Sequence, residues 1–215
     1  MKLIDAYEKI NKFANIPFEK FLSPSQLEDK MLKYNKGKTG QLLEKTIGLN
    51  LSNTTLDFED GELKTNKCDK TGKPLETIFI TQISSFIDEL LSKQDFQSTK
   101  LYKKIKNILY VPISKDGPTS KWMYLTPIHI DLSLPKYEKL SKILEKDYND
   151  ICNELVCQLS TSDSLHTANG RFIQIRTKDS KPYNPIYSKL YKKEISDKNR
   201  AFYFKKDFIK YIKSL

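Results

Sequence analysis

The sequence predicts an α/β (α+β) protein in which helices flank a mixed β-sheet. Apolar residues at helical spacing alternate along the chain with β-branched runs such as "KIKNILYVPIS" (104–114), and turn residues separate the two kinds of segment. The chain has 215 residues, of which 38% are hydrophobic, with 12 Tyr and 11 Phe. That size and composition fit one mid-sized domain, or a large and a small lobe, with a substantial core.

The N-terminal half opens with an amphipathic helix, because Leu3, Tyr7 and Ile10 fall at helical spacing. Ser23 can cap a second helix that has Pro24 in its first turn. The expected elements are a helix from 3, a helix over 23–34, a basic loop over 35–40, a short helix over 41–49, and strands over 61–67 and 74–83 joined by a turn.

The rest of the chain shows the same alternation, and no repeats or clear linker divide it. One long stripe of apolar residues predicts a helix over 137–159 that packs on the core. The other expected elements are a helix over 84–93, strands over 104–114, 121–130 and 170–178, a polar Tyr-rich loop, the segment "RAFYFKK" (200–206) and a last helix.

Positive charge dominates the chain and is concentrated near its C-terminal end. The formal charge is +10, and residues 178–215 carry ten Lys and one Arg against four acids, interleaved with Tyr and Phe. Basic residues mixed with aromatic ones suit the surface of a polyanion such as nucleic acid. The alternative is the solvated surface of a protein from a lysine-rich proteome.

Several classes of protein are excluded by composition. No apolar run reaches the roughly 18 to 20 residues of a membrane span, and the charged N-terminus has no signal-peptide core, so we expect a cytoplasmic protein with no membrane partner. Three Cys without a close pair and two His support neither a disulfide framework nor a zinc site. His129 and His166 are interpreted as non-catalytic, and any metal is expected to be a hard cation on oxygen ligands.

The stretch "LDFEDGELKTNK" (56–67) concentrates acids in this basic chain. Phosphodiester hydrolysis needs a metal held by carboxylates and a lysine that assists it. Residues i and i+2 of a strand share a face, so Glu62 and Lys64 would point together while Leu63 enters the core and offers its carbonyl as a further ligand. With Asp57 in the preceding turn, these residues predict a Mg²⁺ site. The alternative is a solvated β-hairpin.

The acid-x-Lys pattern is not specific by itself. It also occurs at residues 28–30, in a helical context, and at 179–181, in a turn. Only the triplet at 62–64 lies on an expected strand just after an aspartate in a turn.

The surrounding residues resemble the MutH-like GATC endonuclease family, which comprises MutH, a mismatch-repair nicking enzyme, and related GATC-cutting type II restriction enzymes. The resemblance is carried by "NKGKTGQLLEKTIG" (35–48) and "LDFEDGELKTNKCDKTGKPLETIFI" (56–80). It continues in the same order through "KIKNILYVPI", "GRFIQIRTK" and "RAFYFKKDF", so that it covers roughly residues 35 to 210. It implies a restriction-endonuclease-like fold and one endonuclease domain over 1–215, with two lobes around a DNA cleft as a variant of that arrangement.

The resemblance also implies the site residues. Asp57, Glu62 and Lys64 match the catalytic acid, acid and lysine of the family, with Asp57, Glu62 and the Leu63 carbonyl as Mg²⁺ ligands. Glu44 matches a helix glutamate that completes the acidic site. Lys104 matches a further lysine near the active centre, in a register that its neighbours Lys103 and Lys106 leave open.

The same resemblance assigns five residues to DNA. Lys36 and Gly37 match a loop beside the DNA, Arg176 and Lys178 match a basic pair on the recognition loop, and Tyr203 matches a tyrosine near the adenine whose methylation is sensed. The planar fork of an arginine can read guanine bidentately, and lysines suit phosphates.

Two departures from the family pattern affect these assignments. Only four residues separate Asp57 from Glu62, fewer than in the family, so Asp57 must reach the metal from a tighter turn, and Glu59 or Asp60 could substitute for it. Thr177 follows Arg176 where the family has a proline, which predicts a less rigid recognition loop.

The sequence thus predicts a Mg²⁺-dependent type II restriction endonuclease that cuts double-stranded DNA at GATC. One alternative is a MutH repair enzyme that nicks one strand and depends on a MutL-type ATPase; another is an inactive DNA-binding effector module. Because one chain of this size has one active site, double-strand cutting would need a homodimer on DNA, two visits by one chain, or a second MutH-like domain. The chain could then be the catalytic half of a longer enzyme.

Overall fold

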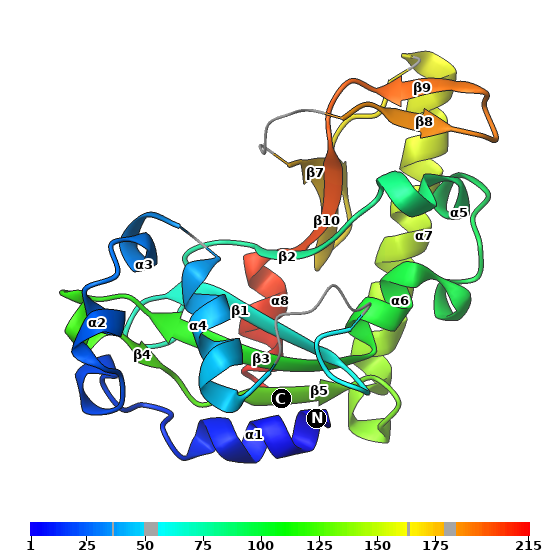
Figure 1. The fold of residues 1–215 in the computed structure, drawn as a ribbon. Coiled ribbons are helices and arrows are strands. Elements are labelled where there is room, and N and C mark those ends of the chain that lie inside the picture. The colour runs from blue at the N-terminus through cyan, green and yellow to red at the C-terminus, as the bar shows by residue number, and fades with distance from the viewer. Residues whose placement is uncertain (36, 50–55, 163, 179–183) are drawn as a thin grey trace. The chain divides into compact units, whose positions relative to one another are not determined.

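The computed structural model describes residues 1–35, 37–49, 56–162, 164–178 and 184–215. The chain divides into two compact units. Unit 1 comprises Met1–Glu76 and Asn107–Asp131, and unit 2 comprises Thr77–Lys106 and Leu132–Leu215. Both combine helices with a β-sheet, which confirms the predicted mixed α+β class (Figure 1). The expectation that residues 1–215 work as one endonuclease domain stays a prediction.

The sheet of unit 1 is mixed and is built around β3. Strand β1 (Glu62–Cys68) runs parallel to β3 (Asn107–Ser114), with Leu63 opposite Leu109. The other edge of β3 pairs antiparallel with β4 (Met123–Tyr124) and β5 (Ile128–Asp131). Because a parallel pair needs a long connection, β1 meets a partner far along the chain.

Helices of unit 1 cover one face of this sheet (Figure 1). The helices and 3₁₀ turns are α1 (Leu3–Asn11), Phe18–Lys20, α2 (Pro24–Leu27), α3 (Met31–Tyr34), α4 (Lys38–Ile47) and Thr119–Lys121. One core cluster joins apolar residues of α1 and α4 to Leu63 of β1 and to Leu109 and Val111 of β3. The intervening strand positions, among them Glu62 and Lys64, therefore point to the opposite face.

The predicted hairpin of residues 61–67 and 74–83 is wrong. The turn after β1 forms, and Cys68 makes one isolated antiparallel β-bridge with Pro74. The strand Ile78–Gln82, however, belongs to a sheet of unit 2. Most of β1 is buried on both faces, which is typical of a strand in a parallel pair and excludes a solvated hairpin.

Two other expectations for unit 1 need correction. The helix predicted over 23–34 is divided: Ser23 caps α2 as expected, in a capping box with Gln26, but the Asp29 carboxylate accepts the Met31 N–H and starts α3 anew. The strand predicted over 121–130 is interrupted at residues 125–127, because Pro127 cannot donate to a ladder.

The sheet of unit 2 has the strand order β2-β10-β7-β6. The strands are β2 (Ile78–Gln82), β6 (Ala168–Asn169), β7 (Ile173–Thr177) and β10 (Arg200–Phe204), and each neighbouring pair in this order is antiparallel. A separate hairpin, β8 (Ile186–Ser188) and β9 (Lys193–Ser196), connects β7 with β10. The expected polar loop contains this hairpin, which the sequence analysis did not predict.

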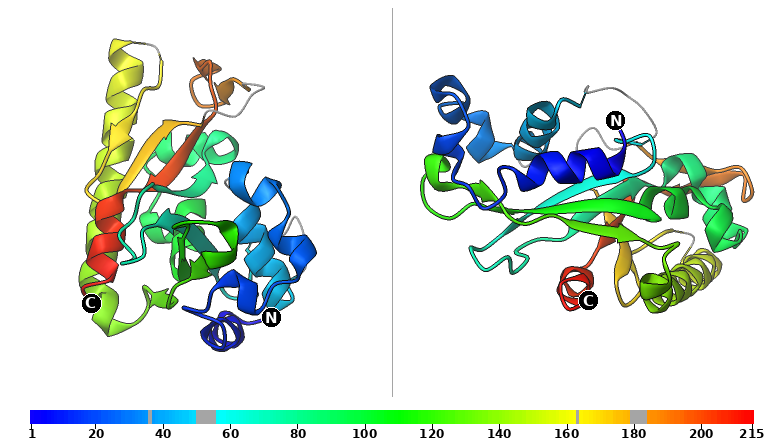
Figure 2. Two further views of the ribbon diagram at one scale, coloured as in Figure 1. Left: turned by 90° about the vertical axis from the view of Figure 1, so that its left-hand side faces the viewer. Right: turned by 90° about the horizontal axis from the view of Figure 1, so that it is seen from below.

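Helix α7 (Glu138–Thr161) runs beside the sheet of unit 2 and contacts β6 and β7 (Figure 2). Its predicted apolar stripe is buried. The other helices and 3₁₀ turns of unit 2 are Ser84–Phe86, α5 (Ile87–Leu91), Phe96–Ser98, α6 (Lys100–Ile105), Pro135–Tyr137 and α8 (Lys206–Ile212). The strand predicted over 104–114 is wrong at its start, because the Thr99 side chain caps α6 and the strand begins at Asn107. Within the described ranges, no helix is long and apolar enough to cross a membrane.

Candidate active site and recognition surface

Glu62 and Lys64 form an ion pair on the edge strand β1. The Lys64 Nζ lies 2.5 Å from the Glu62 Oε2, and the two residues are 2% and 9% exposed. The pair exists because residues two apart in a strand share a face, as the sequence predicts. A carboxylate and an ammonium that are both withdrawn from water each depend on the other, since removal of one partner leaves a buried charge uncompensated.

Asp57 is brought to the same edge of β1 by a tight turn. The Phe58 N–H donates to the Gly61 carbonyl at 2.9 Å, and the Asp57 carboxylate accepts the Leu63 N–H at 2.9 Å. A Cβ on Gly61 would lie 2.6 Å from the Asn107 carbonyl oxygen, so only glycine fits this approach. The short interval between Asp57 and Glu62 therefore still places Asp57 beside the strand.

Glu59 and Asp60, the proposed substitutes for Asp57, are engaged elsewhere. The Asp60 carboxylate accepts the Leu3 N–H at 2.8 Å, and the Glu59 carboxylate pairs with the Met1 amino group at 2.6 Å. The Asn107 side chain also donates to the Asp60 carbonyl at 2.8 Å. Of the three acids in this turn, Asp57 is thus the best candidate for a ligand beside Glu62.

Glu44 lies on α4, close enough to Asp57 for the charge of Asp57 to affect it. Thr39, Leu42, Leu43 and Ile47 bury one face of this helix and leave Glu44 partly buried at its flank. Burial raises the pKa of the Glu44 carboxyl above its usual value, and the negative charge of Asp57 raises it further, while Lys64 acts in the opposite direction. The charges of Asp57 and Lys64 therefore act on Glu44, and the assignment of Glu44 to the acidic site stays a prediction.

We expect Glu44→Gln to stabilise the metal-free protein at neutral pH. A carboxyl whose pKa is raised on folding does not change the free energy of unfolding below its unfolded pKa, because it is protonated in both states. Above that pH it lowers the free energy of unfolding, because the folded state disfavours the charged form. The gain should therefore disappear as pH falls through about 4.5, the ordinary value of this group. Thermal unfolding of both proteins in EDTA from pH 4 to pH 8 checks this, and an unchanged difference across the range would contradict it.

The donors on this edge of β1 suit a hard cation. Asp57 and Glu62 supply carboxylate oxygens, which Mg²⁺ prefers. The N–H and C=O of one residue in an extended strand point to the same side, and the Leu63 N–H points to Asp57, so the Leu63 carbonyl also faces that edge. Within the described ranges no group of three or more His, Cys, Asp or Glu side chains is arranged to hold a metal, so a metal here would depend on two carboxylates and a carbonyl.

Three further residues were predicted from the sequence to belong to the site. Lys36 lies outside the described residues. Gly37 precedes α4, and its N–H donates to the Asn35 side chain at 3.0 Å. Lys104 lies in the last turn of α6, in unit 2. The assignments of Lys36, Gly37 and Lys104 stay predictions.

Unit 2 carries a surface on which cations and aromatic rings alternate. The Arg176 guanidinium lies 4.3 Å from the centre of the Tyr203 ring, and Tyr203 meets Phe79 edge-on at 5.7 Å. The Lys178 Nζ lies 5.1 Å from the centre of the Phe79 ring. Arg176 pairs with Ala201, two positions from Tyr203, which explains why both side chains share a face. Arg176, Lys178, Phe79 and Tyr203 form a candidate recognition surface, called the recognition surface below.

Phe79 was not predicted from the sequence as part of this surface. It is 40% exposed although its neighbours in β2 are buried, and β2 comes from a distant part of the chain to pair with β10. The sequence around Phe79 is an apolar run, and side chains alternate between the two faces of a strand. The local pattern does not show which of these large side chains faces outward. Three of the four residues of this surface, Arg176, Lys178 and Tyr203, were predicted.

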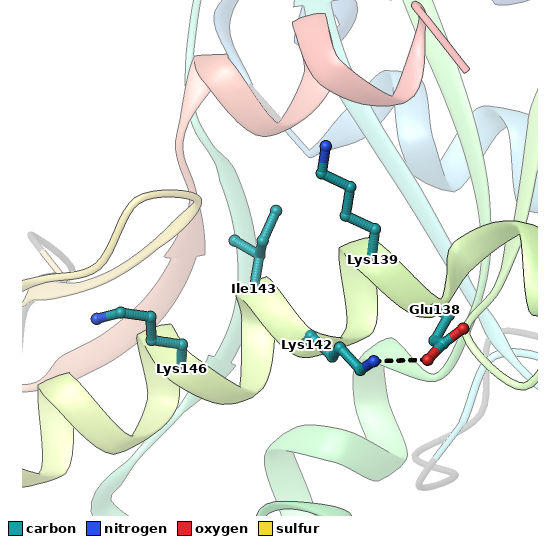
Figure 3. Close-up of a pocket in the computed structure, with 5 residues that line it drawn as sticks. All are labelled: Glu138, Lys139, Lys142, Ile143 and Lys146. Atoms are coloured by element: carbon teal, nitrogen blue, oxygen red, sulfur yellow. Dashed lines mark hydrogen bonds and ion pairs between the residues drawn. The ribbon is translucent and has the colours of Figure 1, made fainter.

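The hollow drawn in Figure 3 lies on the surface of α7 and is lined by none of the predicted site residues. Its lining is Glu138, Lys139, Lys142, Ile143 and Lys146, all from one helix, and Lys142 pairs with Glu138 at 2.6 Å. Exposed i,i+4 pairs of this kind are usual on solvated helices. We assign no function to it.

Known proteins with similar sequences carry mismatch-repair names. The profile described as "DNA mismatch repair enzyme MutH" matches residues 49–147, which include Asp57, Glu62 and Lys64. The chain is 31% identical to the DNA mismatch repair protein MutH of Shewanella woodyi over 163 residues, which are 74% of this chain but 64% of that protein, so it spans less than two thirds of that relative.

Other relatives are covered more fully. The chain is 30% identical to the protein of the same name from Shewanella sp. strain MR-7, over 82% of this chain and 78% of that protein. It is 28% identical to the one from Buchnera aphidicola subsp. Baizongia pistaciae, over 81% and 79%. All three carry mismatch-repair names, which favours the repair alternative over the expected type II restriction enzyme. The mixed α+β architecture is also consistent with the expected restriction-endonuclease-like fold.

Proposed function

The chain belongs to the MutH family, and on that premise we propose that it is a DNA endonuclease that depends on a divalent metal ion and nicks one strand at GATC during mismatch repair. The observation that carries the proposal is the ion pair of Glu62 and Lys64 beside Asp57 on one strand edge. These residue types, in this arrangement, suit hydrolysis of a phosphodiester.

Each side chain at this edge has a proposed role. Mg²⁺, when bound, would polarise the phosphate and activate a water molecule. Asp57, Glu62 and the Leu63 carbonyl would hold it. Lys64, which donates to Glu62 at 2.5 Å, would balance charge that develops on the phosphate. Glu44 would orient the attacking water, and its raised pKa makes it a better proton acceptor than an ordinary glutamate.

The recognition surface would read the DNA. Arg176 lies over Tyr203, which limits the orientations of its guanidinium and favours a bidentate contact with guanine in the major groove. Lys178 would contact a phosphate. The Tyr203 and exposed Phe79 rings would contact the neighbouring bases, where an adenine methyl group would be sensed. The substrate is therefore double-stranded DNA.

The repair role is proposed in place of restriction because the relatives compared carry mismatch-repair names. A repair enzyme would act with a MutL-type ATPase and cut one strand per visit. Double-strand cutting would instead require a second copy of the chain, a second visit by the same chain, or a second domain of the same type. An inactive effector module is disfavoured because Glu44, Asp57, Glu62 and Lys64 are all retained.

The test is incubation of the purified protein with plasmids that carry unmethylated, hemimethylated or fully methylated GATC, with Mg²⁺ and then with EDTA. Nicked circles from the hemimethylated plasmid, cut on the unmethylated strand and absent in EDTA, are expected. Linear product at unmethylated sites would replace the repair role with restriction. Binding to GATC without cleavage in Mg²⁺ or Mn²⁺, both for the protein alone and with a MutL-type ATPase and ATP added, would overturn the nuclease assignment.

A further inference from the structure

A buried carboxylate on α7 binds the chain where it enters β7. Asp147 is 3% exposed. Its carboxylate accepts three consecutive backbone N–H groups, from Arg171 at 2.7 Å, Phe172 at 2.6 Å and Ile173 at 3.1 Å. Hydrogen bonds to an ionised acceptor are stronger than neutral ones, and a buried carboxylate must find such donors.

The backbone before β7 fits tightly around this carboxylate. A Cβ on Gly170 would lie 2.4 Å from the Asp147 Cγ, so no other residue can occupy position 170 without a shift. The Gly170 N–H donates to the Ile173 carbonyl at 2.9 Å, which closes a turn over residues 170–173. The Lys205 Nζ donates to the Gly170 carbonyl at 3.0 Å. The turn is therefore bound by Asp147 through its N–H groups and by Lys205 through a carbonyl.

This attachment defines the register of β7 against β10. The Phe172 carbonyl accepts the Lys205 N–H at 2.7 Å, just beyond the ladder that pairs Ile173 with Phe204. A shift of one residue moves every side chain of a strand to the other face. Such a shift in β7 would take Arg176 away from the Tyr203 ring, which it now approaches to 4.3 Å. The three bonds of Asp147 oppose that shift, because each N–H would lose its acceptor.

We infer that Asp147 is a positioning residue for sequence recognition: it sets the register of β7 and thereby holds Arg176 on the face of Tyr203 where bases are read. The inference rests on the proposed function. It predicts that Asp147 affects discrimination between DNA sequences through Arg176, although it contacts no DNA itself.

The test compares Asp147→Asn with a matched variant, Asp88→Asn. The Asp88 carboxylate binds backbone in the same unit by the same chemistry, at the N–H groups of Lys189 and Leu190 and at the Ser188 hydroxyl, which belong to the β8–β9 hairpin. Asparagine keeps the shape in both places but turns an amide N–H₂ toward N–H donors. Cleavage rates are measured on GATC and on a site altered at the base pair that Arg176 reads.

Asp147→Asn should reduce the ratio of these two rates about tenfold, comparable to the loss of one base contact. Asp88→Asn should keep the ratio within about twofold of the unsubstituted protein, since independent sites do not couple. In an Arg176→Ala background, Asp147→Asn should leave the ratio unchanged, because the contact through which it acts is gone. An unchanged ratio in the first comparison, or an equal further loss in the Arg176→Ala background, would overturn the inference.

Hydrogen exchange keeps the inference testable if Asp147→Asn does not fold. In the unsubstituted protein, the amides of Arg171, Phe172 and Ile173 should exchange as slowly as those inside β7. Fast exchange at all three would refute the attachment. A protein that shows no preference for GATC at all would instead refute the proposed function, and the exchange result would stand independently of it.

Discussion

Replacing Glu62 by glutamine is expected to reduce the cleavage rate at least about a thousandfold while DNA affinity in Ca²⁺ changes by less than about threefold. The substitution removes the negative charge that a metal ion requires and leaves the recognition surface in unit 2 untouched. Cleavage is measured in Mg²⁺ on a GATC plasmid, and binding on a short GATC duplex. Loss of both activities together would argue against a purely chemical role for Glu62.

Glutamine is chosen over alanine because Lys64 depends on Glu62. The two side chains are 2.5 Å apart and are buried, so alanine would leave the ammonium without its partner at a cost of about 3 to 5 kcal/mol. A dead alanine variant could then simply be unfolded. The amide oxygen of glutamine still accepts a hydrogen bond from Lys64, and thermal unfolding should show a smaller loss than for Glu62→Ala.

Asp60→Asn is the matched control for Glu62→Gln. It removes a carboxylate from the same turn, but that carboxylate accepts the Leu3 N–H rather than facing the edge of β1. Cleavage by Asp60→Asn should stay within about threefold of the unsubstituted protein, as usual for a substitution away from the reacting groups. A thousandfold loss in Asp60→Asn would move the metal ligand from Asp57 to Asp60.

Local patterns in the sequence explain why part of this site could be predicted. The pairing of Glu62 with Lys64 follows from the two-residue period of a strand, which needs no knowledge of the rest of the fold. The position of Asp57 does need it, because the turn is fitted against Asn107, about 50 residues later in the chain. From the sequence, Glu59 and Asp60 were therefore equal substitutes, and their contacts with Met1 and Leu3 distinguish them only in the structure.

The largest error of the fold prediction, the hairpin of residues 61–67 and 74–83, has a long-range cause. A strong turn between two apolar runs favours a hairpin locally, but β1 pairs instead with β3 and β2 with β10. Long-range pairing overrides local propensity whenever it buries more of the strand. The long helix α7 was predicted because its apolar stripe repeats over many turns. The β8–β9 hairpin was missed because its strands are short and lie in a polar segment.

Replacing Arg176 by alanine is expected to cost about 1 to 3 kcal/mol of discrimination at one base pair of the site. The guanidinium supplies two donors in a fixed plane, and its position over the Tyr203 ring directs that plane. Cleavage of GATC should therefore fall, while cleavage of a site altered at that base pair should change little. The two rates should become nearly equal for Arg176→Ala.

Two further substitutions, Arg176→Lys and Lys178→Ala, separate base reading from the effect of positive charge. Arg176→Lys keeps the positive charge but loses the two coplanar donors of the guanidinium. It should therefore lose nearly as much discrimination as Arg176→Ala, while binding DNA more tightly than Arg176→Ala does. Lys178→Ala removes a charge on the same surface, near the Phe79 ring, and should weaken binding about equally on all sequences and reduce the salt dependence by about one phosphate. If Arg176→Ala behaved like Lys178→Ala, Arg176 would be a phosphate contact. Base reading would then have to come from the aromatic side chains Tyr203 and Phe79, which share its face of the sheet.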